Sequence, residues 1–137
     1  MSNEKQNEYL VLLRTNEWYN TLSPQELQNV MSQCKEWFER LDAQGKIKGG
    51  QALAREGATI AGKGGRVVSD GPFAESKEAI GGFFVLEAAN LQTAITLVQT
   101  NPLLAHGTTI DIRPVAETCP LEARARQLAQ ETQLAAA

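Results

Sequence analysis

The sequence has 137 residues, of which 42% are hydrophobic and 21% are charged, and these values are typical of one globular domain with a buried core. The longest apolar runs, Tyr9–Leu13 and Phe83–Leu86, are too short to cross a bilayer. A net charge of −3 with scattered lysines and arginines lacks the basic surface of a protein that binds nucleic acid directly. Residues 1–8 are polar and do not resemble a secretory signal, and two cysteines do not make a disulfide framework. We therefore expect a flexible N-terminus and a soluble, cytoplasmic protein.

The first predicted elements are a buried strand and a long amphipathic helix. Tyr9–Arg14 is a continuous apolar run that ends in a cation, as in a central strand covered on both faces. A capping box begins the helix, because Ser23 stands at the N-cap, Pro24 at the first helical position and Glu26 three residues after the serine. Gly45 then supplies a left-handed stop. Between these ends, apolar residues recur at helical spacing: Leu27, Val30, Met31, Cys34, Trp37, Phe38 and Leu41.

A glycine-rich hairpin is predicted in the middle of the chain. Lys46–Ala54 is typical of a strand interrupted by glycines, and Ala58–Ala61 and Arg66–Ser69 flank the turn Gly62-Lys63-Gly64-Gly65. This turn is not a phosphate-binding loop, because it lacks the Gly-Lys-Ser/Thr ending and no helix follows it. Its glycines are therefore explained by backbone geometry.

The C-terminal half adds a strand, a helix and a last strand. Gly81–Ala88 is a strongly apolar strand, and Asn90 caps a helix that must end by Asn101, because the residue before Pro102 avoids the helical conformation. Thr108–Arg113 alternates two isoleucines with polar neighbours, which predicts a strand with one buried face.

This order of elements predicts an α+β fold, the ferredoxin-like βαββαβ sandwich, in which both helices cover one face of an antiparallel sheet. The other face would expose a large apolar area in a monomer, since two of its strands are apolar on both sides. We therefore predict a homodimer that packs through the open sheet face. The domain is expected to span residues 9–115, followed by a C-terminal tail, residues 116–137, in which Leu121–Leu134 can form a helix.

The densest cluster of polar signals lies between the hairpin and the strand at Gly81. Asp70-Gly71-Pro72-Phe73 has the residues of a turn, and Gly81 and Gly82 belong to the backbone of the following strand. Glu75, Lys77 and Glu78 have no such local explanation, because a short loop gains little stability from three charges. They either face a ligand, as functional groups on loops often do, or form a solvated loop.

The same segment resembles the signature of the YCII-related family, also called DGPF-domain proteins. The resemblance rests on Asp70-Gly71-Pro72-Phe73 followed by Glu75, Lys77, Glu78, Gly81 and Gly82, and it extends over about Tyr9–Val115. It implies a dimeric α/β barrel and a cavity between the sheet and the helices. It also implies, by gene context alone, an association with extracytoplasmic-function sigma factors.

Enzymatic proposals for that family rest on a histidine in the first helix and an aspartate before a proline at the end of the second. In this chain the second position is Asn101, which precedes Pro102, and the first falls near Cys34. An amide cannot accept a proton as a base at neutral pH, so the acid/base pair is absent. The family's suggested chemistry is therefore not expected to apply to this chain.

Two arginines are candidate ligand-binding residues. Arg14 and Arg113 end two strands that we expect near the middle of the sheet, where a guanidinium can bind a carboxylate with two hydrogen bonds. Alternatively, their stems lie on the sheet, or they form a buried ionic network with Asp70 or Glu87. The network and the binding site predict different accessibilities for these side chains.

Three further features have both a functional and a structural interpretation. His106, the only histidine, can act as a general base, or it can cap a helix end or face solvent. Cys34 is interpreted as a core residue because it lies on the apolar stripe of the first helix. Trp18 and Tyr19 can line a pocket or a dimer interface, or can cover the core of their own domain. One histidine and no clustered carboxylates or paired cysteines predict no metal site, and no cofactor is expected.

Three hypotheses for function follow. The first is a homodimer that binds a small polar or anionic metabolite through Arg14, Asp70, Glu75, Lys77 and Arg113. The second is an enzyme in which His106 or Asp70 is the base. The third is a regulatory module that binds a sigma factor or another protein.

Overall fold

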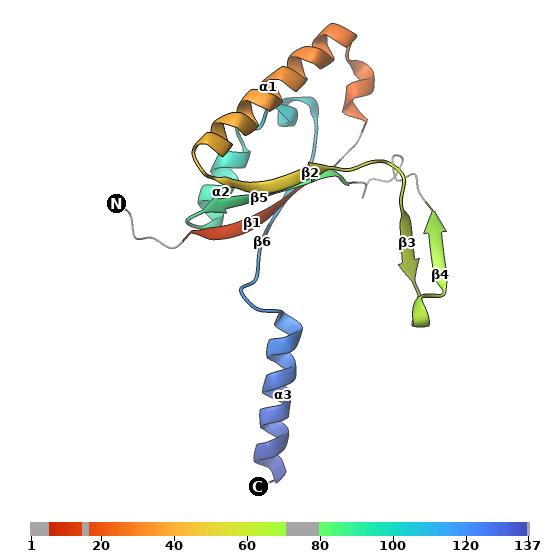
Figure 1. The fold of residues 1–137 in the computed structure, drawn as a ribbon, viewed down its shortest axis with the longest axis vertical. Helices are drawn as coiled ribbons and strands as arrows, with labels where there is room; N and C mark the ends of the chain where they lie inside the picture. The colour runs from red at the N-terminus through yellow and green to blue at the C-terminus, as the bar shows by residue number, and fades with distance from the viewer. Residues whose placement is uncertain (1–5, 15–16, 71–79, 137) are drawn as a thin grey trace.

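Four strands form one antiparallel sheet in the computed structural model, which describes residues 6–14, 17–70 and 80–136. They are β1 (Asn7–Arg14), β2 (Ile47–Ala52), β5 (Ile80–Ala88) and β6 (Ile110–Pro114), in the order β2-β5-β1-β6 (Figure 1). This order is the ferredoxin-like one, so the predicted α+β fold is confirmed. The expectation that both arginine-bearing strands lie near the middle is wrong for Arg113, because β6 is an edge strand.

The two helices of the sandwich begin where their capping residues predict. The helix α1 (Pro24–Ala43) starts with a complete capping box: the Oγ of Ser23 accepts a hydrogen bond from the amide of Glu26, whose carboxylate accepts one from the amide of Ser23. Gly45, with a φ of 72°, follows the helix end. The helix α2 (Leu91–Val98) is capped by Asn90, whose Oδ1 accepts from the amide of Thr93 at 2.8 Å.

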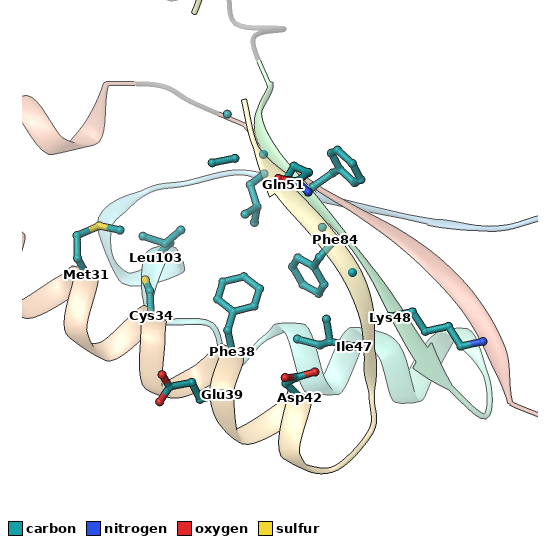
Figure 2. A pocket seen from close by; sticks show the side chains of 17 residues that line it. Met31, Cys34, Phe38, Glu39, Asp42, Ile47, Lys48, Gln51, Phe84 and Leu103 are labelled. Atoms are coloured by element: carbon teal, nitrogen blue, oxygen red, sulfur yellow. The ribbon is translucent and has the colours of Figure 1, made fainter. Parts of the chain in front are cut away.

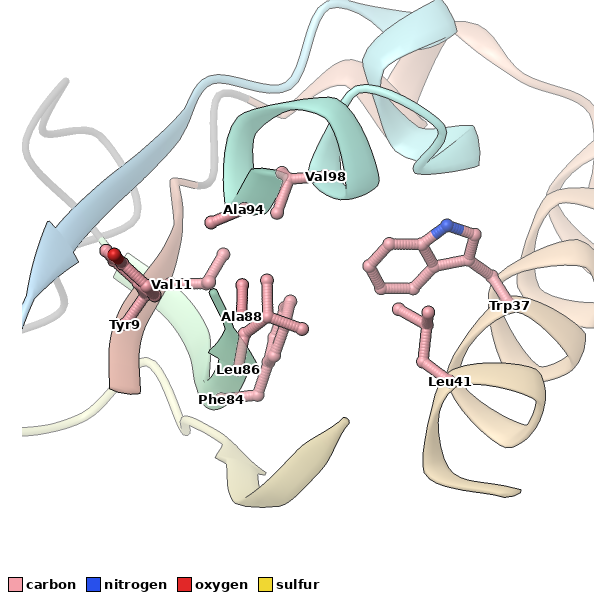
Figure 3. Packing of buried hydrophobic residues seen from close by; sticks show 9 residues of the cluster. All are labelled: Tyr9, Val11, Trp37, Leu41, Phe84, Leu86, Ala88, Ala94 and Val98. Carbon is pink, nitrogen blue, oxygen red and sulfur yellow. The ribbon is translucent and has the colours of Figure 1, made fainter. Parts of the chain in front are cut away.

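Both helices cover the same face of the sheet, and the core lies between them and the strands (Figure 3). Alternate residues of β5 point into this core, as period-two side-chain orientation requires. Trp37 from α1 packs edge-on against the ring of Phe84, with centroids 5.8 Å apart, and its indole Nε1 donates to the Oγ1 of Thr100 at 2.7 Å. The buried cluster consists of Tyr9, Val11, Trp37, Leu41, Phe84, Leu86, Ala88, Ala94 and Val98.

None of the helices that the structure describes covers the opposite face of the sheet (Figure 1). Leu10 stands directly opposite Val85, and Leu12 directly opposite Phe83, on the neighbouring strands β1 and β5. Because directly opposed residues share a face, these four half-buried side chains form one apolar patch on the side away from the core. We call this patch the open face. Its presence agrees with the sequence argument for a dimer, and the dimer itself stays a prediction.

Two elements extend away from the sandwich. Strands β3 (Ala58–Ala61) and β4 (Val67–Asp70) pair as a separate two-stranded hairpin around the 3₁₀ turn η2 (Lys63–Gly65), as the sequence predicts. The helix α3 (Pro120–Ala136) occupies the C-terminal region. In Figure 1 both lie on the side of the sheet opposite to α1 and α2.

Two 3₁₀ turns complete the described part of the chain. They are η1 (Trp18–Thr21), before α1, and η3 (Pro102–His106), after α2. Within the described ranges, no helix combines the length and the apolar character that crossing a membrane requires.

Candidate functional site

A cavity of about 720 Å³ lies between α1 and the β2–β5 side of the sheet (Figure 2). Its size is within the range of small-molecule sites. Phe38 from α1 and Phe84 from β5 meet edge-on within it, with ring centroids 5.0 Å apart. The lining residues are Leu13, Met31, Cys34, Phe38, Glu39, Asp42, Ile47, Lys48, Gly49, Gly50, Gln51, Ala52, Gly81, Gly82, Phe83, Phe84 and Leu103.

Glycines make the sheet side of this cavity. Gly49 and Gly50 on β2, and Gly81 and Gly82 on β5, place main chain where other residues would place side chains. A Cβ on Gly50 would lie 2.4 Å from the carbonyl oxygen of Phe83, so only glycine allows the strands to approach this closely. The sheet side of the cavity is therefore formed largely by the main chain of two neighbouring strands.

The interior of the cavity is mainly apolar and contains one thiol. Cys34 is 5% exposed and belongs to the buried face of α1, which confirms its interpretation as a core residue. Burial raises the pKa of its thiol, so the reactive thiolate is disfavoured there. Met31 and Leu103 lie beside it in the cavity wall (Figure 2).

Charged groups occur at the rim rather than in the interior. Glu39 and Asp42 reach the rim from the last turns of α1. The ammonium group of Lys48 pairs with the carboxylate of Glu87 at 3.1 Å, and this hydrogen bond together with the charges of Glu87 and Glu8 raises the pKa of Lys48. Among the described residues that line the cavity, Lys48 is the cation and is already paired with Glu87, while two carboxylates stand at the cavity edge.

Asn101, the residue at the family's aspartate position, has a structural role that the sequence did not predict. It is 3% exposed, and its Oδ1 accepts from the amide of Leu103 at 2.9 Å, so it caps η3 and fixes Leu103 in the cavity wall. Its Nδ2 finds no acceptor among the residues that the structure describes. An amide at this position holds the wall and supplies no proton.

The predicted ligand-binding arginines lie on the strands away from the cavity. The Nε of Arg14 donates to the Oδ2 of Asp111 on the neighbouring strand at 2.5 Å, in a half-buried ion pair. Arg113 is exposed on the edge strand β6, opposite Leu10. Neither arginine belongs to the cavity lining. The sequence predicted an ionic network of these arginines with Asp70 or Glu87. In the structure, Glu87 pairs with Lys48.

The remaining candidates from the segment after the hairpin are only partly within the described residues. Asp70 ends β4, and its side chain is not described. Glu75, Lys77 and Glu78 lie outside the described residues. Their assignment as ligand-binding residues stays a prediction.

His106 belongs to a second cluster, formed by aromatic and cationic side chains from three segments. Its ring stacks on that of Trp18, with centroids 5.6 Å apart and an interplanar angle of 28°. Trp18 meets Tyr19 edge-on at 5.9 Å, and the guanidinium of Arg55 lies 5.6 Å from the centre of the Tyr19 ring. This arrangement favours the structural interpretation of Trp18 and Tyr19, because their rings cover neighbouring residues of the same chain.

Comparisons with known proteins found a match to a family and to a solved structure. The model of the family described as "YCII-related domain" matches residues 7–118. A structural search finds 5-chloro-2-hydroxyhydroquinone dehydrochlorinase (TftG) from Burkholderia phenoliruptrix AC1100, solved in complex with 2,5-dihydroxybenzoquinone. It is 19% identical, the match covers 76% of this chain and 90% of that one, and the TM-score is 0.40. No curated protein sequence matches the chain.

Proposed function

The chain belongs to the YCII-related domain family, and from this premise we propose that it is a homodimer that binds a small, mainly apolar and uncharged molecule in the cavity between α1 and the sheet. The observation that carries the proposal is the composition of the cavity wall. Phe38, Phe84 and Met31 offer apolar contact area, and the glycines of β2 and β5 leave room for a ligand ring beside the main chain.

The charges on the described lining residues support an uncharged ligand. The sequence suggested a polar or anionic metabolite, but the arginines of that hypothesis do not line the cavity. Glu39 and Asp42 at the rim would repel an anion, and the ammonium group of Lys48 is held by Glu87. A neutral ligand avoids both the repulsion and the cost of removing a charge from water.

The dimer is proposed from the open face. Leu10, Leu12, Phe83 and Val85 have the alternation of a buried surface and no layer over them. Sheet-to-sheet packing of two copies would bury this patch, as two stacked sheets bury their inner faces at a spacing of about 10 Å. Light scattering of the wild-type chain at micromolar concentration tests this: a dimer is expected, and a monomer would contradict the proposal.

Ligand class is tested with two dyes that differ by one charged group. N-phenyl-1-naphthylamine is neutral, and 8-anilinonaphthalene-1-sulfonate carries a sulfonate on the same aromatic framework. We expect saturable fluorescence enhancement with the neutral dye and at least about tenfold weaker binding of the sulfonate, which corresponds to about 1.4 kcal/mol.

A cavity-filling variant identifies the binding position. Met31→Trp adds an indole at the cavity wall, and it should weaken binding of the neutral dye at least about tenfold. The matched control is Gln33→Trp, which adds the same group at an exposed position of α1 outside the cavity. Equal binding by Met31→Trp and wild type, or tighter binding of the sulfonate, would contradict the proposal.

The enzyme and the sigma-factor module are not proposed. His106 is stacked on Trp18 and does not belong to the cavity lining. Position 34 holds a buried thiol and position 101 holds a capping amide, where the family's acid/base pair would stand. Within the described ranges, no charged or aromatic surface favours a sigma factor over another partner.

A further inference from the structure

The β3–β4 hairpin has an apolar face that no other described part of the chain covers. Ile60 is 69% exposed and Val68 is 60% exposed, and the two residues stand directly opposite each other on the paired strands. An isolated two-stranded hairpin is marginally stable in water, and it becomes stable when a third strand or a helix packs on it. Among the residues that the structure describes, none supplies this layer to the hairpin.

The helix α3 is a second element without a partner. Its 17 residues are almost entirely exposed, including Leu121 at 79% and Leu128 at 45%. In proteins, most of the stability of a helix comes from packing of its apolar side against other elements. Leu121, Ala125 and Leu128 follow one another at spacings of four and three residues, so they form a narrow apolar stripe along one side of α3.

The hairpin and α3 extend on the same side of the sheet, the side that carries the open face (Figure 1). Within one chain they stand apart, with the space below the open face between them. A second copy packed on the open face would occupy that space. Both unpartnered elements would then lie beside the second copy rather than in solvent.

The length of the hairpin is sufficient for this contact. Its strands have four residues each, which corresponds to about 14 Å at about 3.4 Å per residue. Stacked sheets lie about 10 Å apart, so the hairpin of one copy extends past the sheet of the other. Its apolar face is thereby brought to the level of the partner's projecting elements.

The area of the open face also requires additional contacts. A stable interface buries about 800 Å² per partner, whereas even a fully exposed aromatic side chain offers only about 150–250 Å². The four half-buried apolar side chains of the open face, of which one is aromatic, supply only part of such an area, and contacts outside them would have to supply the rest. The exposed residues of the hairpin and α3 supply apolar surface next to the same interface.

We propose that the two elements complete each other across the two-fold axis of the dimer: the Ile60–Val68 face of each hairpin packs on the Leu121–Leu128 stripe of the partner's α3. The proposal rests on the homodimer of the proposed function and adds a clasp outside the sheet-to-sheet contact. In this contact the hairpin gains a helix that packs on it, and α3 gains an apolar surface to pack against. In a two-fold dimer this contact occurs twice and closes the assembly.

Charge substitutions in the full chain test the clasp. Ile60→Lys and Leu128→Glu each place a charge in the contact, and each should raise the dimer dissociation constant at least about tenfold in sedimentation equilibrium. Both residues are exposed in the single chain, so the sandwich should keep its thermal stability. Thr59→Lys and Gln130→Glu are the matched controls, since they place the same charges on the opposite faces of the hairpin and the helix.

Mixing the two variants adds a specific readout. A heterodimer of Ile60→Lys and Leu128→Glu copies places the lysine of one copy opposite the glutamate of the other in one of its two contacts, so it should form more readily than either variant homodimer. Wild-type affinity in both single variants would overturn the clasp and leave the sheet-to-sheet dimer standing. A monomeric wild type would overturn the dimer and the clasp together, whereas dye binding reports on the cavity separately.

A disulfide test identifies which chain supplies the helix. In a Cys119→Ser background, Val68→Cys and Ala125→Cys in one chain should oxidise to a covalent dimer. A monomeric oxidised product with an internal disulfide would overturn the exchange between copies. If no disulfide forms while the protein remains dimeric, the contact between the hairpin and the partner's α3 would also be overturned.

Discussion

Replacing Gly50 by alanine tests whether close approach of β2 and β5 sets the stability of the cavity wall. The new Cβ would lie 2.4 Å from the carbonyl oxygen of Phe83 and 2.7 Å from the Cβ of Phe84. Both contacts are about 1 Å shorter than normal van der Waals separations, which are about 3.5 Å or more. Since one contact is with backbone, the strands themselves must separate.

The expected cost of Gly50→Ala is about 3 kcal/mol, at the upper end of the overpacking range. For a domain of this size, that cost lowers the melting temperature by about 10 °C. Urea denaturation followed by tryptophan fluorescence measures it, because Trp37 is 2% exposed in the folded chain.

Gly82→Ala provides the graded comparison on the facing strand. Its Cβ would lie 3.1 Å from the carbonyl oxygen of Gln51, which a shift of a few tenths of an ångström relieves. We expect Gly82→Ala to lower the free energy of unfolding by about 1 kcal/mol. If Gly50→Ala is no less stable than Gly82→Ala, or unfolds like the wild type, close strand approach does not explain the glycine at position 50.

Three further predictions concern the helix start, the buried indole and the thiols. Ser23→Ala removes a capping acceptor and should cost about 1 kcal/mol in urea denaturation; an unchanged midpoint would show that the cap contributes nothing. In a double-mutant cycle of Trp37→Phe and Thr100→Val, the coupling energy should be about 1 kcal/mol, and additive effects would argue against their hydrogen bond. Cys119 is exposed and should react quickly with a thiol reagent at pH 8, whereas Cys34 should react only on unfolding; equal rates would contradict its burial. Burial raises the pKa of Cys34 in the folded chain. The contribution of the buried, neutral thiol to the free energy of unfolding is therefore complete below the pKa of the unfolded thiol, about 8.5. This contribution is lost as pH rises from there through the folded pKa. When the pH is raised above about 8.5, the free energy of unfolding should therefore fall less in Cys34→Ala than in the wild type.

Local signals predicted the elements well because each depends on a few neighbouring residues. The capping residues Ser23 and Asn90 fix helix starts by hydrogen bonds that span three positions, and both are where the sequence predicts them. The hairpin strands also match, because the glycine-rich turn between them is a local feature. The ferredoxin-like fold was predicted correctly from the order of these elements along the chain, and the family from the signature at residues 70–82.

Non-local packing set the limit of the prediction for the site. The edge position of Arg113 follows from the ferredoxin-like strand order, in which the last strand is an edge strand, so it was predictable once the fold was. The cavity depends on two glycine pairs, Gly49-Gly50 and Gly81-Gly82, that become neighbours only when β2 pairs with β5. The available signal in the sequence was the occurrence of a glycine pair in each of two predicted strands. Backbone geometry alone does not reveal that the two pairs meet. The ion pair between Arg14 and Asp111 could be predicted only with the register of β6 against β1.

The strand β5 separates two compartments of the molecule. Phe84 faces the cavity side, whereas Val85 faces the side on which the proposed dimer forms. The main chain of one strand therefore carries both walls, and a displacement that a ligand imposes on Phe84 is transmitted directly to the residue beside it. Thermodynamic linkage makes such a coupling reciprocal: any factor by which ligand tightens or loosens the dimer is the factor by which dimerisation changes ligand affinity.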